Sequence, residues 1–313
     1  MITIGKTNYK GWANCYRISN GEAELIITSD IGPRIMRYGF PGGRNLLKEV
    51  EETLGQSGEE HWVIRGGHRI WIAPEHMPRT YAPDNEPVKI EISGATLKAT
   101  QQVERYSGIE KRIAVRMAEH GTGVEIVHGL RNATPWPVEL AAWALTMMAP
   151  GGTGISGFPP RGTHPEMLAP TNPLVMWAFT NLADNRWLFN RKYFTLRQDP
   201  GNPDPQKIGS FHPRTWGAYL LGSDLFVKRY DADVSRTYPD MGCSFEMFTN
   251  ADTLELETLG PMTKLEPGES LDHIERWTLE RNIELGDWSD GELDRIALGD
   301  PSAPARCSAQ PGR

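Results

Sequence analysis

The sequence has no long hydrophobic run, no excess of basic residues and no cysteine pair. No stretch of about 18 apolar residues, the length that spans a bilayer, occurs in it, so we expect no contact with a membrane. Its net charge of −7 argues against a nucleic-acid surface, because phosphate binding needs an excess of Lys and Arg. These absences leave room for one anionic small ligand held in a local basic pocket.

The three cysteines are Cys15, Cys243 and Cys307, far apart and odd in number. No spacing among them resembles a zinc site or a disulfide framework. Reduced thiols fit a cytoplasmic protein, and residues 1–8 lack the basic and apolar regions of a signal peptide. The glycine-rich run 151–154 lacks the Lys-Ser/Thr that follows in a phosphate-binding loop. We therefore expect a cytoplasmic protein without a cofactor.

Glycine and proline are abundant, with 32 and 24 residues, which suits many short strands joined by turns. Between the turns, apolar and polar residues alternate with a period of two, which indicates antiparallel sheet with one buried face. The expected strands cover residues 22–28, 88–92, 96–99, 112–117, 124–130, 216–221, 225–230, 244–249, 253–259 and 271–279. Helical signals are weak and confined to 46–54 and 287–296. The sequence therefore predicts an all-β fold.

No composition change or linker divides the chain, which favours a single domain. We expect a β-sandwich domain over residues 1–285, a short helical extension over 286–300 and a disordered tail over 301–313. Two segments rich in Pro and Gly, 150–173 and 199–213, are expected to be long loops, which often carry function.

Three segments together carry a resemblance to a known family. They are Ile-Gly-Pro-Arg-Ile at 31–35, Ile-Arg-Gly-Gly-His-Arg-Ile-Trp-Ile-Ala-Pro-Glu at 64–75, and Leu-Glu-Leu-Glu-Thr at 254–258 followed by Leu-Glu-Pro-Gly-Glu. In this order, the set resembles the galactose mutarotase-like superfamily of aldose 1-epimerases and hexose-6-phosphate mutarotases, as a divergent branch. The resemblance implies a large antiparallel β-sandwich that holds a sugar.

The resemblance also implies an acid and a base for anomer exchange. Glu257, in its Leu-Glu-Thr context, matches the catalytic base of the family. The family acid is a histidine in a middle strand, but the matching stretch, 139–146, contains none. Each group must lie within hydrogen-bond reach of the proton that it transfers. We predict that His68, which follows two glycines, replaces the missing acid, although it could instead be a turn residue that bonds only backbone.

Glu255 is two residues from Glu257, so both side chains share one face of a strand, roughly 7 Å apart. If that face lines a pocket, their repulsion raises one pKa. Alternatively, both carboxylates lie on a solvated face balanced by Lys264 or Arg276.

Other residues are candidates for contacts to the sugar. Arginine forks can hold hydroxyl, carboxylate or phosphate oxygens, and aromatic rings can pack on a pyranose. Three arginines, at positions 65, 69 and 79, favour an acidic or phosphorylated sugar. Glu75 and His76, with His68 nearby, could be metal ligands, but Pro74 interrupts any helical zinc motif, so turn roles are expected and no metal. The predicted substrate-binding residues are Arg65, Arg69, Trp71, Glu75, His76, Trp143 and Glu255.

Three functions are consistent with these residues. The first is an aldose 1-epimerase-like isomerase, which requires Glu257 and His68 or His76 in one cleft. The second is a non-catalytic sugar-binding module, favoured by the missing histidine. The third is a lyase or hydrolase that uses paired carboxylates. In each case the partner is a small sugar or sugar derivative, and the protein is a monomer or homodimer.

Overall fold

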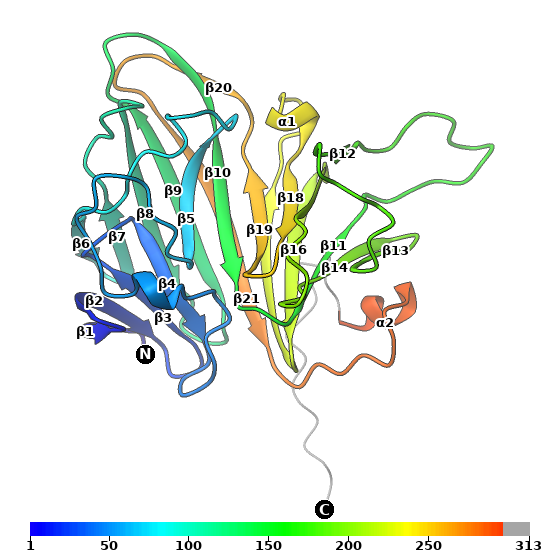
Figure 1. Ribbon diagram of the computed structural model, residues 1–313, viewed down its shortest axis with the longest axis horizontal. Coiled ribbons are helices and arrows are strands. Elements are labelled where there is room, and N and C mark those ends of the chain that lie inside the picture. Colours follow the sequence, from blue (N-terminus) through cyan, green and yellow to red (C-terminus); the bar gives the residue numbers. More distant parts are fainter. Residues whose placement is uncertain (297–313) are drawn as a thin grey trace, which may run out of the picture.

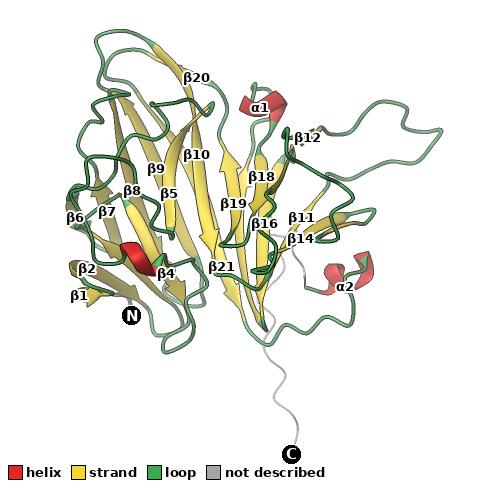
Figure 2. Cartoon of the chain, in the orientation of Figure 1, coloured by secondary structure: helices red, strands yellow, loops and turns green. Residues whose placement is uncertain are grey.

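The computed structural model describes residues 1–296, and these form a sandwich of two antiparallel sheets (Figure 1). The prediction of an all-β fold is confirmed: strands dominate, and helices are few and short (Figure 2). The tail expected over 301–313 lies outside the described residues. Within residues 1–296, no helix is long and apolar enough to cross a membrane.

The first sheet has 11 strands, and its central members, β5, β10, β19, β18 and β15, carry the side chains discussed below. In spatial order its strands are β1 (Thr3–Tyr9), β2 (Trp12–Ser19), β3 (Glu24–Thr28), β4 (Arg34–Gly39), β5 (His68–Ala73), β10 (Val138–Met148), β19 (Leu254–Leu259), β18 (Phe245–Thr249), β15 (Gln206–Ser210) and β12 (Leu174–Met176), with β20 (Thr263–Leu265) paired to β10.

The second sheet has 10 strands and packs against the first. In spatial order these are β13 (Trp187–Phe189), β14 (Tyr193–Arg197), β11 (Thr153–Gly157), β16 (Arg214–Leu221), β17 (Asp224–Asp231), β21 (Ser270–Glu280), β9 (Val124–Asn132), β8 (Ile109–Met117), β7 (Thr96–Thr100) and β6 (Lys89–Ser93). The helices are η1 (Glu51–Thr53), α1 (Pro239–Gly242) and α2 (Asp290–Arg295).

The core lies between the sheets and follows from the period-two alternation. In β8, Ile113, Val115 and Met117 are buried, whereas the intervening residues are more exposed. Each fully buried side chain of this kind stabilises the fold by about 1.5–3 kcal/mol. The same alternation gives the first sheet an interior face, packed against the second sheet, and an outer face.

The two faces of β5 differ in chemistry. Ile70 and Ile72 belong to the main core between the sheets. Trp71 and Ala73 belong to a separate cluster on the outer face. Because alternate residues of a strand point to opposite faces, Arg69 lies on the outer face with Trp71, and His68 lies on the interior face with Ile70.

Candidate active site

Charged side chains from neighbouring strands form one row across the outer face of the first sheet. Leu145 of β10 is paired with Arg69 of β5 on one side and with Glu257 of β19 on the other. Glu257 is in turn paired with Glu246 of β18. Neighbouring strands are roughly 4.8 Å apart, so the register brings these charges together although they are distant in sequence.

Glu257 is fully buried, and two donors contact one oxygen of its carboxyl group. The indole Nε1 of Trp143 lies 2.7 Å from Glu257 Oε2, and the ammonium of Lys207 lies 2.9 Å from the same oxygen. Lys207 also contacts the rings of Trp143 and Trp177, with its Nζ 4.9 and 4.7 Å from their centroids. An ion pair and a hydrogen bond to a carboxylate both favour the charged form.

Glu246 shares the same ammonium, with Lys207 Nζ 2.6 Å from its Oε2. Burial raises the pKa of Glu246 well above its ordinary value, Lys207 opposes this shift, and Glu257 adds to it. Two carboxylates that share one buried cation cannot both be fully neutralised. Glu246 therefore holds a proton more readily than a solvated glutamate would.

Glu255 is the third glutamate of this face, half-buried and two residues before Glu257. Burial and the charge of Glu257 together raise its pKa to about 7, against an opposing effect of Arg69. Near neutral pH this carboxyl is therefore present in both its acid and its base form, which suits a proton donor. The alternative partners Lys264 and Arg276 are paired elsewhere, with Glu266 and Asp231.

Arg69 lies among aromatic rings, with its guanidinium carbon 3.9 Å from the Trp71 ring centroid and 5.1 Å from that of Trp62. Burial lowers its pKa to about 10. Its Nε and Nη1 donate no hydrogen bond within the described chain. Trp71 also packs against Trp143, with ring centroids 5.4 Å apart. These two tryptophan rings therefore lie between Arg69 and Glu257. Unused donors beside aromatic rings are suited to holding hydroxyl oxygens of a sugar.

A strained turn places one more carboxyl near Glu246. Asp240 and Met241 of α1 have φ values of 50° and 60°, a left-handed conformation that non-glycine residues rarely adopt. In Figure 1, α1 lies beside the upper end of β18. Burial raises the pKa of Asp240, and the charges of Glu257 and Glu75 add to this shift. Backbone strain of this kind tends to persist at functional sites.

His68 lies on the interior face and does not meet Glu257, contrary to the prediction from the sequence. It is fully buried, and its Nδ1 lies 2.9 Å from the Thr146 hydroxyl. Its Nε2 lies 2.7 Å from Nε2 of His128, which belongs to the second sheet. The cause is strand alternation: residue 68 shares its face with Ile70, whereas Glu257 projects from the opposite face of the same sheet.

The partners of His68 are organised by a buried lysine. Lys228 of β17 donates to Thr146 Oγ1 at 3.0 Å and to the carbonyl oxygens of Ala144 and Leu256, each at 3.1 Å. Its ammonium also forms an ion pair with Glu275 at 2.7 Å. Both charges are fully buried, so each depends on the other for compensation.

These contacts define the protonation of the histidines. Because Thr146 Oγ1 accepts from Lys228, its hydroxyl hydrogen is free to donate to His68 Nδ1. His68 Nε2–H then donates to His128 Nε2, and His128 Nδ1–H donates to the carbonyl oxygen of His273, 2.9 Å away. This order leaves both rings neutral, in agreement with the burial that lowers the pKa of each.

His68, His128 and Glu275 have ligand-type atoms within 4.8 Å of one another. Their atoms are already used, however, since both imidazoles are hydrogen bonded and Glu275 is paired with Lys228. A divalent cation would also have to lie beside that ammonium. We therefore assign this cluster to the packing of the sheets and not to a metal.

The remaining predicted residues are divided between the site and its surroundings. Arg65 is buried and used within its own loop, where it donates to the Thr53 carbonyl at 2.9 Å and pairs with Glu59. His76 is exposed, and its amide donates to Thr80 Oγ1. Glu75 accepts a hydrogen bond from Tyr81 at the rim of the site. The predicted residues that the structure brings together are Arg69, Trp71, Glu75, Trp143, Glu255 and Glu257.

Lys207 and Glu246 are the main residues that sequence reasoning missed. Glu246 lies between Phe245 and Met247, so a charge inside an apolar strand was an available signal. Lys207 lies in a segment expected to be a loop, but it belongs to β15 and is paired with Phe248 of β18. No local sequence pattern predicts its contact with Glu257, which is 50 residues further along the chain.

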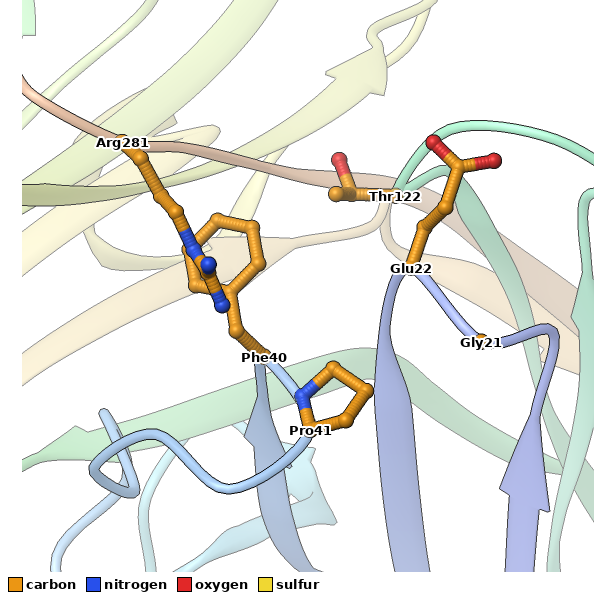
Figure 3. A pocket seen from close by; sticks show the side chains of 6 residues that line it. All are labelled: Gly21, Glu22, Phe40, Pro41, Thr122 and Arg281. Carbon is orange, nitrogen blue, oxygen red and sulfur yellow. The ribbon is translucent and has the colours of Figure 1, made fainter.

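A separate cavity of about 330 Å³ lies away from these carboxylates (Figure 3). Figure 3 shows the guanidinium of Arg281 beside the ring of Phe40. The guanidinium carbon lies 3.6 Å from the ring centroid. Glu22, also in this lining, accepts from the amide of Gly121 at 2.8 Å. The lining residues are Gly21, Glu22, Phe40, Pro41, Thr122 and Arg281. Because one carboxylate is present, this cavity lacks the paired acid and base of the outer face.

The two-sheet sandwich, with acidic and aromatic side chains on the outer face of its central strands, has the galactose mutarotase-like fold. A galactose mutarotase-like protein from Lactobacillus casei aligns with a TM-score of 0.56 and 9% identity, over 85% of this chain and 100% of the other. A galactose mutarotase related enzyme from Lactobacillus acidophilus gives 0.55 and 9%, over 86% and 98%. The Slr1438 protein from Synechocystis gives 0.55 and 12%, over 90% and 100%.

No family model matches the chain, and no curated protein matches it. At identities of 9–12%, the structural neighbours establish the fold and leave the chemistry to be argued from this chain's own residues.

Proposed function

We propose that the protein binds a sugar on the outer face of β5, β10, β19, β18 and β15 and exchanges its anomers by proton transfer. The observation that supports this proposal is the difference between Glu255 and Glu257. Lys207 forms an ion pair with Glu257 and Trp143 donates a hydrogen bond to it, whereas burial and the charge of Glu257 raise the pKa of Glu255 to about 7. Paired carboxyl groups whose environments differ in this way are suited to separate acid and base roles.

In the proposed reaction, Glu257 accepts the proton of the anomeric hydroxyl and Glu255 donates a proton to the ring oxygen. The bond between the anomeric carbon and the ring oxygen breaks, which gives an open-chain aldehyde. Rotation about the adjacent bond and reversal of both transfers close the ring as the other anomer. Each carboxyl recovers its starting proton state, so no co-reactant is needed.

The surrounding groups have binding roles. Trp71 and Trp143 offer aromatic surface for the apolar face of a pyranose. Arg69 offers two unused donor nitrogens, Nε and Nη1, for oxygen atoms of the ligand. Lys207 pairs with the base and does not itself transfer a proton, because its ion pairs raise its pKa above that of a free amine.

Exchange NMR between the α and β anomer signals tests this proposal on a panel of neutral, amino, acidic and phosphorylated sugars. We expect faster exchange for at least one sugar and its loss in a Glu257→Gln variant. Equal exchange by the wild type and the variant contradicts the assignment of the base.

A second candidate is a sugar-binding protein without catalysis. It is favoured by the absence of a histidine from residues 139–146 and by the interior position of His68. In that case, saturation-transfer NMR shows sugar binding, while the anomer signals exchange at the rate of buffer. A glycan that is cleaved, detected as new reducing ends, indicates instead that the paired carboxylates act on a glycosidic bond.

A further inference from the structure

The charges of the outer face do not balance. Its carboxyl groups are Glu75, Asp240, Glu246, Glu255 and Glu257, and the cations whose charges act on them are Arg69 and Lys207. The nearby pair of Arg34 and Asp84 adds no net charge. If all these groups ionise, five negative charges face two positive ones, so the face takes up either protons or a cation.

Unused acceptor atoms lie in the same place. Glu257 Oε1 and Glu246 Oε1 accept no hydrogen bond within the described chain, although both side chains are fully buried. Glu246 Oε2 is occupied by the ammonium of Lys207. Buried polar atoms without partners are rare and need an explanation. These acceptor atoms need hydrogen-bond donors from a ligand, and an ammonium group has three donors and no acceptor.

The site already holds one ammonium in this manner. Lys207 Nζ lies 2.6 Å from Glu246, 2.9 Å from Glu257 and within 5 Å of the ring centroids of Trp143 and Trp177. Carboxylates and tryptophan faces together are a known chemistry for recognising amines. The single ammonium of Lys207 leaves the other acceptor atoms unused.

We infer that the preferred ligand of this face is a sugar that carries an ammonium group, an inference that rests on the proposed sugar-binding function. A cationic amino group supplies positive charge to this group of carboxyls and donors for the unused Glu257 Oε1 and Glu246 Oε1. From the sequence alone, the arginines near residues 65–79 favour an acidic or phosphorylated sugar. Arg65, however, is used by Glu59 and Arg79 donates to the Pro74 carbonyl, so Arg69 alone would have to balance a phosphate against five carboxyl groups.

Isothermal titration with galactose, galactosamine and galactose 6-phosphate tests the inference, at a pH where the sugar amine is protonated. A charge-assisted hydrogen bond is stronger than a neutral one, so we expect galactosamine to bind roughly tenfold or more tightly than galactose. Galactose 6-phosphate is expected to bind most weakly. The affinity for galactosamine should fall with added salt, while that for galactose should change little.

A Glu246→Gln variant removes one negative charge while keeping the shape of the side chain. It should lose most of the preference for galactosamine and still bind galactose. Glu91→Gln, an exposed change on β6 of the other sheet, is the matched control, and thermal unfolding checks that both variants fold. Equal affinity for the neutral and amino sugars, or tighter binding of the phosphate, overturns the inference while the proposed sugar site stands. Absence of binding by all three sugars overturns both.

Discussion

Glu255 and Glu257 lie on one face of β19, two residues apart, but in different environments. Trp143 and Lys207 hold Glu257 at 2.7 and 2.9 Å, whereas burial and the neighbouring carboxylate raise the pKa of Glu255 to about 7. Mutual repulsion between like charges becomes useful when one of them is fixed by partners, because the proton then resides on the other. This asymmetry leads to the first two predictions.

Replacing Glu257 by Gln should abolish most of the anomer exchange. Loss of a general base costs roughly 10²- to 10⁴-fold in rate. The amide has nearly the same shape, so sugar binding, followed by titration calorimetry, should change far less than the rate measured by exchange NMR. A variant that keeps more than about half of the wild-type rate is inconsistent with Glu257 as the base.

The rate of exchange should fall as the pH rises above about 7, because Glu255 must be protonated to act as the acid and its pKa is about 7. The sign follows from its role: above its pKa the carboxyl has lost the proton that it donates. A Glu255→Gln variant should be slower and should lose this limb of the pH profile. A limb that persists unchanged in the variant assigns the titration to another group.

Replacing Lys228 by Met should destabilise the protein by roughly 3–5 kcal/mol, because the change leaves Glu275 buried without its partner. Urea unfolding measures the loss. The double variant Lys228→Met with Glu275→Gln removes both charges and should recover a large part of the stability. If the double variant is as unstable as the single one, packing and not the ion pair explains the loss.

Acid should destabilise the interior network of histidines. Burial lowers the pKa of His128, and burial and the charge of His128 lower that of His273 to about 3. The unfolded chain therefore binds protons below about pH 6.5 that the folded chain does not, and stability falls as the pH drops. Glu246 and Glu255, whose pKa values are raised, act in the opposite sense over part of this range.

Because of this opposition, the informative quantity is the difference between wild type and a His128→Gln variant in urea unfolding at several pH values. The variant should lose less stability between about pH 7 and pH 5, since one buried titrating group is gone. His120→Gln, an exposed change, should follow the wild type. Parallel curves for the wild type and His128→Gln contradict the prediction.

The fold and part of the site could be predicted because both depend on alternation within single strands. The period of two identified the strands around Val115 and Ile126, and it placed Glu255 and Glu257 on one face. The same rule applied to residues 68–72 assigns His68 to the side of Ile70 and Ile72, so its interior position was accessible from the sequence. The glycines before it favoured a turn instead.

The contacts of Lys207 could not be predicted, because they depend on which strands become neighbours. β15, β18 and β19 are adjacent in the sheet, and their register brings Lys207, Glu246 and Glu257 together. Long-range pairing of this kind is not encoded in any short stretch of sequence. The same holds for Lys228, whose carbonyl acceptors, Ala144 and Leu256, lie on the opposite sheet.

Lys228 holds the backbone carbonyls of Ala144 and Leu256, the residues that directly precede Leu145 and Glu257. Glu275 supplies its counter-charge from β21. Replacing either residue alone leaves an unpaired charge buried between the sheets. Mutation at one position should therefore be tolerated only when the other position is also mutated. Among homologous chains, positions 228 and 275 are therefore expected to co-vary, either as an ion pair or as two apolar side chains of similar volume.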